Sequence, residues 1–378
     1  FDVVIGNPPY VYRNADFDGY KNYFKTNFFA TSGNFDLYKF FIELSLKIQK
    51  PNSFHSFITN SSFLLQNSFS QTREFIISNS EIIQLIPLGP NVFDEATVDS
   101  VVYILKKVKS ESNLIEIKTP EEPKEIFNSK SKSIEQSRFL KNDGFVFDYL
   151  LEGKEYDIID RLFKNFPLIE TKYDFGVGIN TGYIKEELTS EIKINEKYHP
   201  MVPGTGIPQK YGKVRTTGFI MYDKEFVKSK GKLGRTLPDE KFLSRPKILV
   251  VRTRNISMKQ RIISTIDYDS CYNLNRLSNI ISKENNSLEG LLGVLNSKLF
   301  NWIYSVRFLD YEIKPIYLRN SPLCDTNNED LINKVQEILS LKKENAAADT
   351  SALEREIDFM VYALYGLSEE EIGIVENS

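Results

Sequence analysis

Cysteine and histidine are scarce in this chain of 378 residues. The only cysteines, Cys271 and Cys324, lie far apart in the sequence, which argues against a disulfide framework and against a cysteine-rich zinc site. The only histidines, His55 and His199, are not at the spacing of metal ligands. We therefore expect no metal site, and a reducing, cytoplasmic (bacterial) setting.

Long apolar runs are also absent. No run reaches the roughly 18 apolar residues of a membrane-spanning helix, so we expect no membrane partner. The first five residues, Phe-Asp-Val-Val-Ile, lack the basic stretch, long apolar core and cleavage site of a secretory leader. They also lack an initiator Met and begin directly on an apolar strand. We expect the chain to be part of a longer polypeptide.

Length and charge suggest two domains and a nucleic-acid partner. A chain of 378 residues favours two domains. Its net charge of −3 hides a strong asymmetry. Residues 201–261 hold 15 lysines and arginines against 4 acidic residues, a local net charge of +11, so the rest of the chain sums to −14. Localised positive charge is typical of proteins that bind nucleic acid.

The hydrophobic pattern of the first part alternates between strands and helices. Apolar spacing predicts strands at residues 2–5, 54–59, 81–87 and 100–105, and helices at residues 37–49 and 70–78. This alternation indicates an α/β fold.

The rest of the chain has a different character. Lys, Glu and Ser crowd the region after residue 106, so we expect an exposed connector at 109–165, with one hairpin, that ends in a helix at 155–164. Short strands are expected at 173–281 and a helix near 291–303. An amphipathic helix is expected around 353–364, with Gly366 as its C-cap. A capping box at 368–371 then predicts a last short helix.

The strongest chemical signal is Asn7-Pro8-Pro9-Tyr10, directly after the first expected strand. The exocyclic amine of adenine is a poor nucleophile because its lone pair is delocalised into the ring. The side-chain oxygen of Asn7 and the carbonyl of Pro8 are two acceptors for the amine hydrogens. The two prolines fix φ and preorganise both acceptors. Tyr10 is placed to stack on a base rotated out of the duplex. The alternative reading is a proline-rich turn.

On these residues the chain resembles the TaqI-like N(6)-adenine DNA methyltransferases, especially the methylase and specificity parts of type IIG restriction-modification enzymes. The resemblance continues in five further stretches, residues 35–43, 57–63, 91–105, 176–182 and 245–252. It also includes two later ones, residues 295–299 and 357–371. It implies that Phe93 helps to hold the flipped adenine, whereas core packing is the alternative role for Phe93.

The resemblance also implies a domain organisation. Residues 1–108 would be the C-terminal half of a Rossmann-like methyltransferase domain, 109–165 the connector with a helix, and 166–378 a mixed α/β target-recognition domain. The family binds S-adenosylmethionine through a Gly-rich loop and an acidic residue upstream of the catalytic loop, and this main binding motif is absent from the chain. Gly176-Val177-Gly178 lacks the strand–loop–helix context of a cofactor loop. The chain alone is therefore expected to be inactive.

Type IIG enzymes carry a nuclease domain, which we expect in the same native polypeptide. Glu312-Ile313-Lys314 resembles half of a metal-nuclease motif, with Asp310 close by. The same form recurs at Glu116-Ile117-Lys118 and Glu191-Ile192-Lys193, so it is too common to carry weight. We expect no DNA cleavage by this chain.

The basic region supplies the candidate contacts to double-stranded DNA. The predicted DNA-binding residues are Lys210, Lys213, Arg215, Arg235, Arg252, Arg254, Lys259 and Arg261. A solvated, lysine-rich surface is the alternative. The expected function is site-specific adenine methylation in a restriction-modification system. Two other functions stay open, an RNA or protein methyltransferase and a DNA-binding specificity subunit without catalysis.

Overall fold

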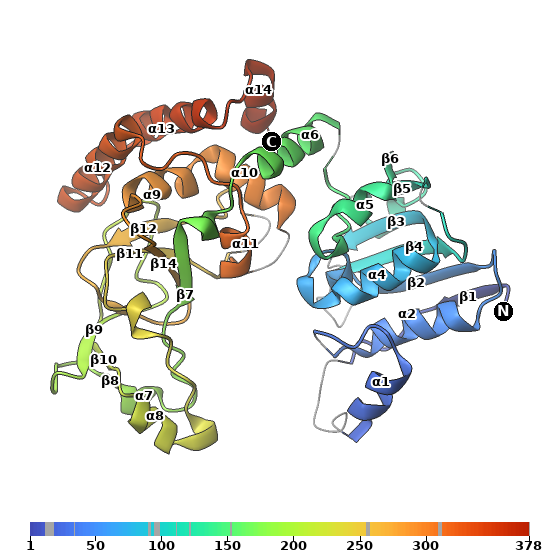
Figure 1. Cartoon of the computed structure of the whole chain (residues 1–378), viewed down its shortest axis with the longest axis horizontal. Coiled ribbons are helices and arrows are strands. Elements are labelled where there is room, and N and C mark those ends of the chain that lie inside the picture. Colours follow the sequence, from blue (N-terminus) through green and yellow to red (C-terminus); the bar gives the residue numbers. More distant parts are fainter. Residues whose placement is uncertain are drawn as a thin grey trace. The chain divides into compact units, whose positions relative to one another are not determined.

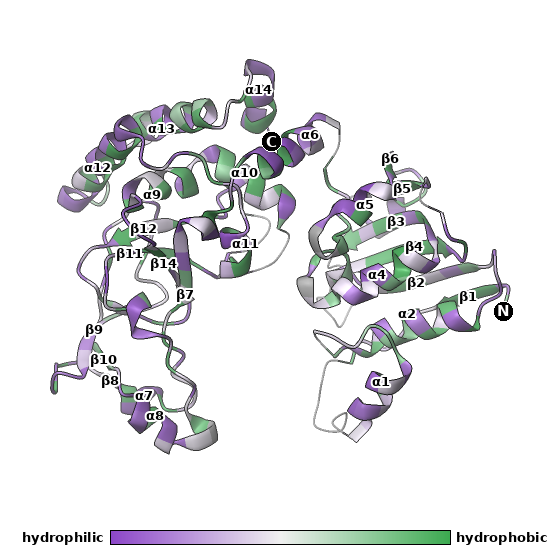
Figure 2. Cartoon of the chain, in the orientation of Figure 1, coloured by the Kyte–Doolittle hydropathy of each residue, from purple (hydrophilic) through white to green (hydrophobic). Residues whose placement is uncertain are grey.

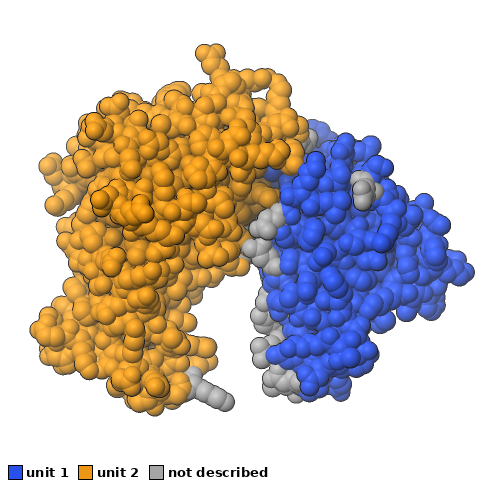
Figure 3. Space-filling model, in the orientation of Figure 1, with its two compact units in different colours: residues 1–152 blue, residues 153–378 orange. Residues whose placement is uncertain are grey.

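The computed structural model describes residues 1–11, 19–33, 35–89, 92–93, 99–110, 112–120, 122–151, 153–254, 258–308 and 312–377. The chain divides into two compact units, residues 1–152 and residues 153–378, coloured separately in Figure 3. Each unit is described by itself.

The described residues of the first unit form one six-stranded sheet with helices packed against it (Figure 1). Its strands are β1 (Val3–Gly6), β2 (Phe54–Asn60), β3 (Glu81–Gly89), β4 (Ser100–Lys106), β5 (Leu114–Lys118) and β6 (Ser131–Glu135). Its helices are α1 (Lys21–Asn27), α2 (Leu37–Ile48), α3 (Ser62–Leu65), α4 (Ser70–Asn79) and α5 (Ser137–Lys141).

The order of the strands decides where loops of this unit meet. The sheet runs β1-β2-β4-β3-β5-β6. Strand β1 is parallel to β2, whereas β4 is antiparallel to both of its neighbours, β2 and β3. Strands β1, β2 and β3 therefore point the same way, and their carboxyl ends share one edge of the sheet. Ligands of open α/β sheets bind at this edge.

The prediction of a connector between the domains is wrong for residues 109–151. Residues 109–151 belong to the first unit, because β5 pairs with β3 and forms a hairpin with β6. Ile115, Ile117 and Ile134 are buried in the same core as Tyr38 and Ile42 of α2. Since β5 and β6 each bury one face only, a few apolar residues suffice among many Lys, Glu and Ser. The boundary lies near residue 152, and α6 (Gly153–Asn165) begins the second unit.

The described residues of the second unit contain two four-stranded sheets, ordered β13-β9-β10-β8 and β12-β11-β14-β7. The strands are β7 (Tyr173–Val177), β8 (Thr189–Ser190), β9 (Tyr198–Val202), β10 (Phe219–Met221), β11 (Lys247–Val251), β12 (Ser264–Asp267), β13 (Tyr272–Asn273) and β14 (Leu277–Ser282). The helices after α6 are α7 (Lys185–Leu188), α8 (Lys224–Ser229), α9 (Leu288–Asn296), α10 (Lys298–Arg307), α11 (Pro315–Arg319), α12 (Glu329–Glu344), α13 (Ser351–Leu364) and α14 (Glu369–Asn377).

The C-terminal helices confirm some predicted signals and correct another. Gly366 has a φ of +63° after α13, as a glycine C-cap requires. The Glu371 carboxylate accepts from the Ser368 N–H at 2.8 Å and the Ser368 hydroxyl accepts from the Glu371 N–H at 3.3 Å, which is the predicted capping box. The single helix expected near 291–303 is two helices, because extended Ser297 caps α10 by accepting from Phe300.

Helix α12 was not predicted from the sequence. In Figure 2, α12 and α13 both show hydrophobic residues beside hydrophilic ones. Leu331, Val335 and Ile338 of α12 are fully buried, and this helix packs on α9 and α13. In the part of the chain that the structure describes, no helix combines the length and apolar character needed to cross a bilayer.

Candidate functional site

The loop Asn7-Pro8-Pro9-Tyr10 begins where β1 ends, at the shared carboxyl edge of the sheet. Gly6 is the last residue of β1 and pairs with Phe57. Pro8 is buried and anchors the loop, whereas Asn7 and Pro9 are exposed. No hydrogen bond joins the Asn7 side chain to another described residue, so its amide is available to a ligand at this edge.

Tyr10 is held in one orientation beside two other aromatic rings. Its hydroxyl donates to the carbonyl oxygen of Ile58 at 2.8 Å. Its ring lies edge-on to Tyr38 and to Phe93, with both centroid distances at 6.2 Å. Burial raises the pKa of Tyr10 to about 12, so the phenol stays a neutral donor. The structure thus brings Tyr10 and Phe93 together, and their contact with a base stays a prediction.

The resemblance around Phe93 is only partly visible. Val92 and Phe93 are described, whereas Asn91 and the stretch Asp94–Val98 lie outside the described residues. Strand β3 ends at Gly89 and β4 starts at Ser100. Phe93 therefore stands between two strands at the same edge as the Asn7 loop.

Two polar side chains at the start of α2 belong to this neighbourhood and were not predicted. Tyr38 is fully buried, and its hydroxyl makes no hydrogen bond with a described residue. Asp36 is half-buried, one of its carboxylate oxygens has no partner among the described residues, and burial raises its pKa to about 6. The N–H of Leu37 donates to Val11, directly after the loop. The stretch 35–43 signalled a resemblance, but not these environments.

A buried arginine organises the chain that follows β2. The Arg73 guanidinium is fully buried and donates to the carbonyl oxygens of Phe63 at 2.6 Å, Gln66 at 2.8 Å and Gly144 at 2.7 Å. These bonds tie α3 and the turn after it to the end of the first unit. Arg73 therefore stabilises the segment that follows the carboxyl end of β2. The sequence did not predict this role.

Gly176 and Gly178 serve packing in the second unit. A Cβ at Gly176 would lie 2.5 Å from the Phe242 ring, and one at Gly178 would lie 2.3 Å from the Leu274 carbonyl oxygen. Gly176 lies within β7, and Gly178 follows its end. Strand β7 is antiparallel to β14, and the next helix, α7 (Lys185–Leu188), is only four residues long, so these glycines do not have the parallel strand–turn–helix setting of a methyl-donor loop.

The predicted DNA-binding residues fall into two groups. Lys213, Arg215, Arg235 and Lys259 are exposed, and no hydrogen bond or ion pair joins their side chains to described residues. Four free cations on one unit are available to phosphate oxygens without first breaking a contact.

The other four predicted residues have partners within the unit. Lys210 pairs with Glu354 at 2.7 Å, and Arg252 pairs with Glu312 at 2.9 Å. Arg254 donates to the Gln260 carbonyl oxygen. Arg261 is fully buried beside the Tyr304 ring, so the prediction that it contacts DNA is wrong. Arginine carries a long apolar stem, and charge alone does not reveal which stems are buried.

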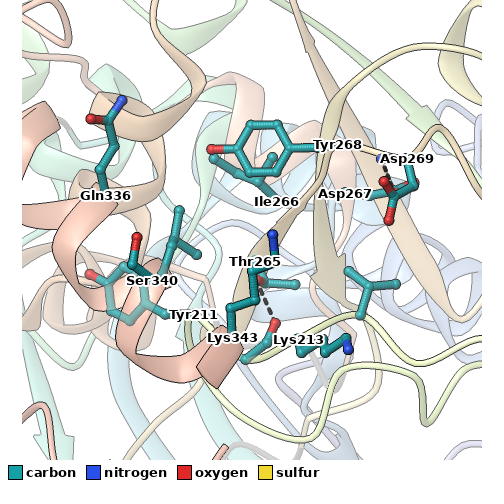
Figure 4. A pocket seen from close by; sticks show the side chains of 13 residues that line it. Tyr211, Lys213, Thr265, Ile266, Asp267, Tyr268, Asp269, Gln336, Ser340 and Lys343 are labelled. Atoms are coloured by element: carbon teal, nitrogen blue, oxygen red, sulfur yellow. Dashed lines mark hydrogen bonds between the residues drawn. The ribbon is translucent and has the colours of Figure 1, made fainter. Parts of the chain in front are cut away.

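A cavity of about 440 Å³ lies in the second unit (Figure 4). The predicted residue Lys213 and the helix residue Lys343 line it, together with Asp267 and Asp269. The Asp267 carboxylate is already engaged at 2.7 Å by the buried ammonium of Lys247. All the residues that line this cavity belong to the second unit, whereas the Asn7 loop belongs to the first.

The chain matches two protein-family models. Residues 1–93 match the Eco57I restriction-modification methylase, and residues 199–323 match the TaqI-like C-terminal specificity domain. The first match contains the Asn7 loop and Phe93. The second contains all the predicted DNA-binding residues.

Curated relatives agree with these matches. The chain is 28% identical over 388 residues to RM.MjaORFECS2P of Methanocaldococcus jannaschii, assigned as a type II restriction enzyme and methyltransferase. That alignment covers 97% of this chain and 31% of the relative. This chain is also 27% identical over 207 residues to the type II restriction enzyme and methyltransferase RM.Eco57I of Escherichia coli. That alignment covers 50% of this chain and 20% of the relative. The chain thus spans at most a third of these relatives.

Solved structures share the fold. The type IIL restriction-modification enzyme MmeI, solved in complex with DNA, has a TM-score of 0.64 at 13% identity, covering 98% of this chain and 55% of that one. A nuclease-deletion mutant of the type ISP enzyme LlaGI has a TM-score of 0.55 at 11% identity, covering 90% and 41%. With its two family matches, the chain carries an Eco57I-type methylase segment and a TaqI-like specificity domain, and its homologues are type II restriction enzymes and methyltransferases.

Proposed function

We propose that the native protein containing this chain transfers a methyl group from S-adenosylmethionine to the exocyclic amine of adenine in duplex DNA, as part of a restriction-modification system. The observation that carries the proposal is the Asn7 amide. This amide has no hydrogen-bond partner among the described residues, and it lies at the carboxyl edge of the sheet in the same loop as Tyr10, whose ring contacts Phe93. The two aromatic rings suit a planar base, and the Asn7 amide oxygen suits the amine group of that base.

Each loop residue has a distinct task in this proposal. The two amine N–H groups donate hydrogen bonds to the Asn7 side-chain oxygen and to the Pro8 carbonyl oxygen, which shifts electron density onto the nitrogen. The proline rings hold both acceptors in place before the base arrives, so little reorganisation is needed. Tyr10 and Phe93 hold the base after it leaves the duplex. The hydrogen bond from the Tyr10 hydroxyl to the Ile58 carbonyl oxygen fixes the position of the ring against which the base would stack.

The methyl donor supplies the electrophilic methyl group when it is bound. Within the described residues, no glycine-rich turn joins the end of a parallel strand to a helix. We therefore assign no donor contact to this chain and derive no step through the donor. In the proposal, this chain contributes the side of the site that faces the base.

The second unit is the proposed DNA-reading part. Its support is the TaqI-like specificity match over residues 199–323, and four exposed cations without a partner in the described part of the chain, Lys213, Arg215, Arg235 and Lys259. Cations that are exposed and unpaired give binding energy through the release of counterions from the DNA. A nuclease domain in the same native polypeptide remains part of the proposal, by analogy with the relatives.

The direct test is product analysis. The native protein is incubated with duplex DNA and radiolabelled S-adenosylmethionine, and the DNA is digested to nucleosides. We expect the label in N6-methyladenine. Label in methylcytosine, label only in RNA or protein substrates, or no transfer to DNA would contradict the proposed function.

A further inference from the structure

Two large apolar side chains are exposed on neighbouring turns of the second unit. Tyr183 is 81% exposed and Leu233 is 55% exposed. The N–H of Tyr183 donates to the carbonyl oxygen of Leu233 at 3.0 Å, so the two turns are joined. An aromatic ring this exposed gains nothing for the fold, because its apolar surface stays in water.

The exposure of Tyr183 is imposed by the backbone around it. The Asn180 side chain accepts from the Gly182 N–H at 3.1 Å, and Gly182 has a φ of +57°. A Cβ at Gly182 would lie 2.6 Å from the Leu233 carbonyl oxygen, so only glycine allows the two turns to meet. The next residue, Ile184, is buried in a hydrophobic core of the second unit. Tyr183 is thus held outward by a fixed turn and a buried neighbour.

One cationic side chain, that of Arg235, lies beside this apolar pair. Arg235 runs along the same turn, since its Cγ would lie 3.1 Å from a Cβ at Gly182. Arg235 is exposed, and its guanidinium makes no hydrogen bond or ion pair with described residues. Lys228 lies on α8 nearby in sequence, and Lys230 pairs with Glu187 of α7. Leu233 and Arg235 both fall within the specificity-domain match.

We propose that Tyr183 and Leu233 form an apolar wedge that packs against the bases of DNA bound by the second unit, while Arg235 binds an adjacent phosphate. This inference rests on the proposed function. Apolar wedges among cations are how proteins unstack and bend a duplex, because the bases offer π-faces while the backbone offers negative charge. A protein partner would favour an interface whose centre is depleted of charge.

A tryptophan probe tests the wedge directly. Trp302 is the only tryptophan of the chain and is buried, so it gives a constant background. Tyr183→Trp places a second indole at the wedge, and Phe359→Trp places one at another exposed aromatic position, on α13. On titration with a mixed-sequence duplex, we expect quenching at position 183 and none at position 359, at equal binding by fluorescence anisotropy.

Affinity and salt dependence separate the wedge from the charge. Tyr183→Ala is expected to weaken duplex binding about tenfold, the scale of one lost stacking contact, without changing the salt dependence. Arg235→Ala is expected to lower the salt slope by about 1, because one phosphate contact is lost. Phe359→Ala serves as the matched control, with no effect on either.

The outcomes distinguish the two proposals. Duplex binding with an unquenched tryptophan at position 183 would overturn the wedge and leave the proposed function in place. Wild-type self-association that Tyr183→Ala abolishes, with unchanged DNA affinity, would make this surface an interface between copies and overturn the wedge. Failure of the wild-type chain to bind any duplex would overturn the wedge and the DNA-reading role of the second unit together.

Discussion

At the residue scale, the candidate site combines free and constrained groups. Asn7 is exposed and its amide has no hydrogen-bond partner among the residues that the structure describes, whereas the Tyr10 hydroxyl is bound to the Ile58 carbonyl oxygen. Asp36 is a charged group in an unfavourable environment. Its carboxyl is half-buried and forms no ion pair with a described residue. Burial raises its pKa from 3.8 to about 6.

That shift predicts a pH-dependent gain on removing the charge. The raised pKa means that the protonated carboxyl suits the fold. The stability that it contributes is complete below pH 3.8 and is lost as the pH rises through about 6. Asp36→Asn is therefore expected to stabilise the first unit by about 1–2 kcal/mol at pH 8 and to change little near pH 4. Denaturation followed by circular dichroism measures this, and an equal effect at both pH values would refute it.

Tyr10 allows the ring and the hydroxyl to be tested apart. Tyr10→Phe loses the bond to Ile58 at a cost of about 1 kcal/mol in stability, but keeps the ring. Tyr10→Ala also loses stacking worth roughly 1–3 kcal/mol. With 2-aminopurine at the target position, the native protein and Tyr10→Phe are expected to raise the fluorescence on binding, and Tyr10→Ala to lose most of the rise. An undiminished signal in Tyr10→Ala would make Tyr10 a structural residue only.

At the scale of elements, the apolar pattern predicted β1 to β4, α2 and α4 within two residues, but not the short helices α1 and α3. The expected helix at 37–49 is α2, and the expected strand at 54–59 is β2. A hairpin was expected in the connector and is present as β5 and β6, but its pairing with β3 was not predicted, because its few buried isoleucines stand among Lys, Glu and Ser. The Asn7 loop was readable because its chemistry is local in sequence. The roles of Tyr38 and Asp36 were not, since burial by distant residues creates them.

Arg73 provides a test of an element's anchor. Arg73→Met would leave one buried and two partly buried carbonyl groups without their donor, so the first unit is expected to lose about 3 kcal/mol. Arg161→Met serves as the control, because Arg161 forms a more exposed ion pair with Glu371 and is worth about 1 kcal/mol at most. Chemical denaturation compares the two. Equal losses would show that the Arg73 contacts do not organise the turn after β2.

At the scale of the whole molecule, the distribution of free cations predicts how DNA binding responds to salt. Replacing Arg215 and Lys259 together by Ala is expected to weaken duplex binding and to lower the salt slope by about 2. Lys154 and Lys164 are the charge-matched control pair, since both are exposed on α6 but already engaged by acidic residues. Anisotropy titrations at several salt concentrations measure both pairs. The same loss from the control pair would mean that net charge, and not position, governs binding.

The central claim is that Asn7 activates the amine of adenine. The decisive measurement is methyl transfer to DNA by the native protein carrying Asn7→Ala, with duplex affinity measured in parallel. We expect the rate of transfer to fall about 100-fold or more, the scale of losing one preorganised polar contact in a transition state, with DNA affinity unchanged because Asn7 carries no charge. Transfer near the wild-type rate in this variant would show that Asn7 does not activate the amine.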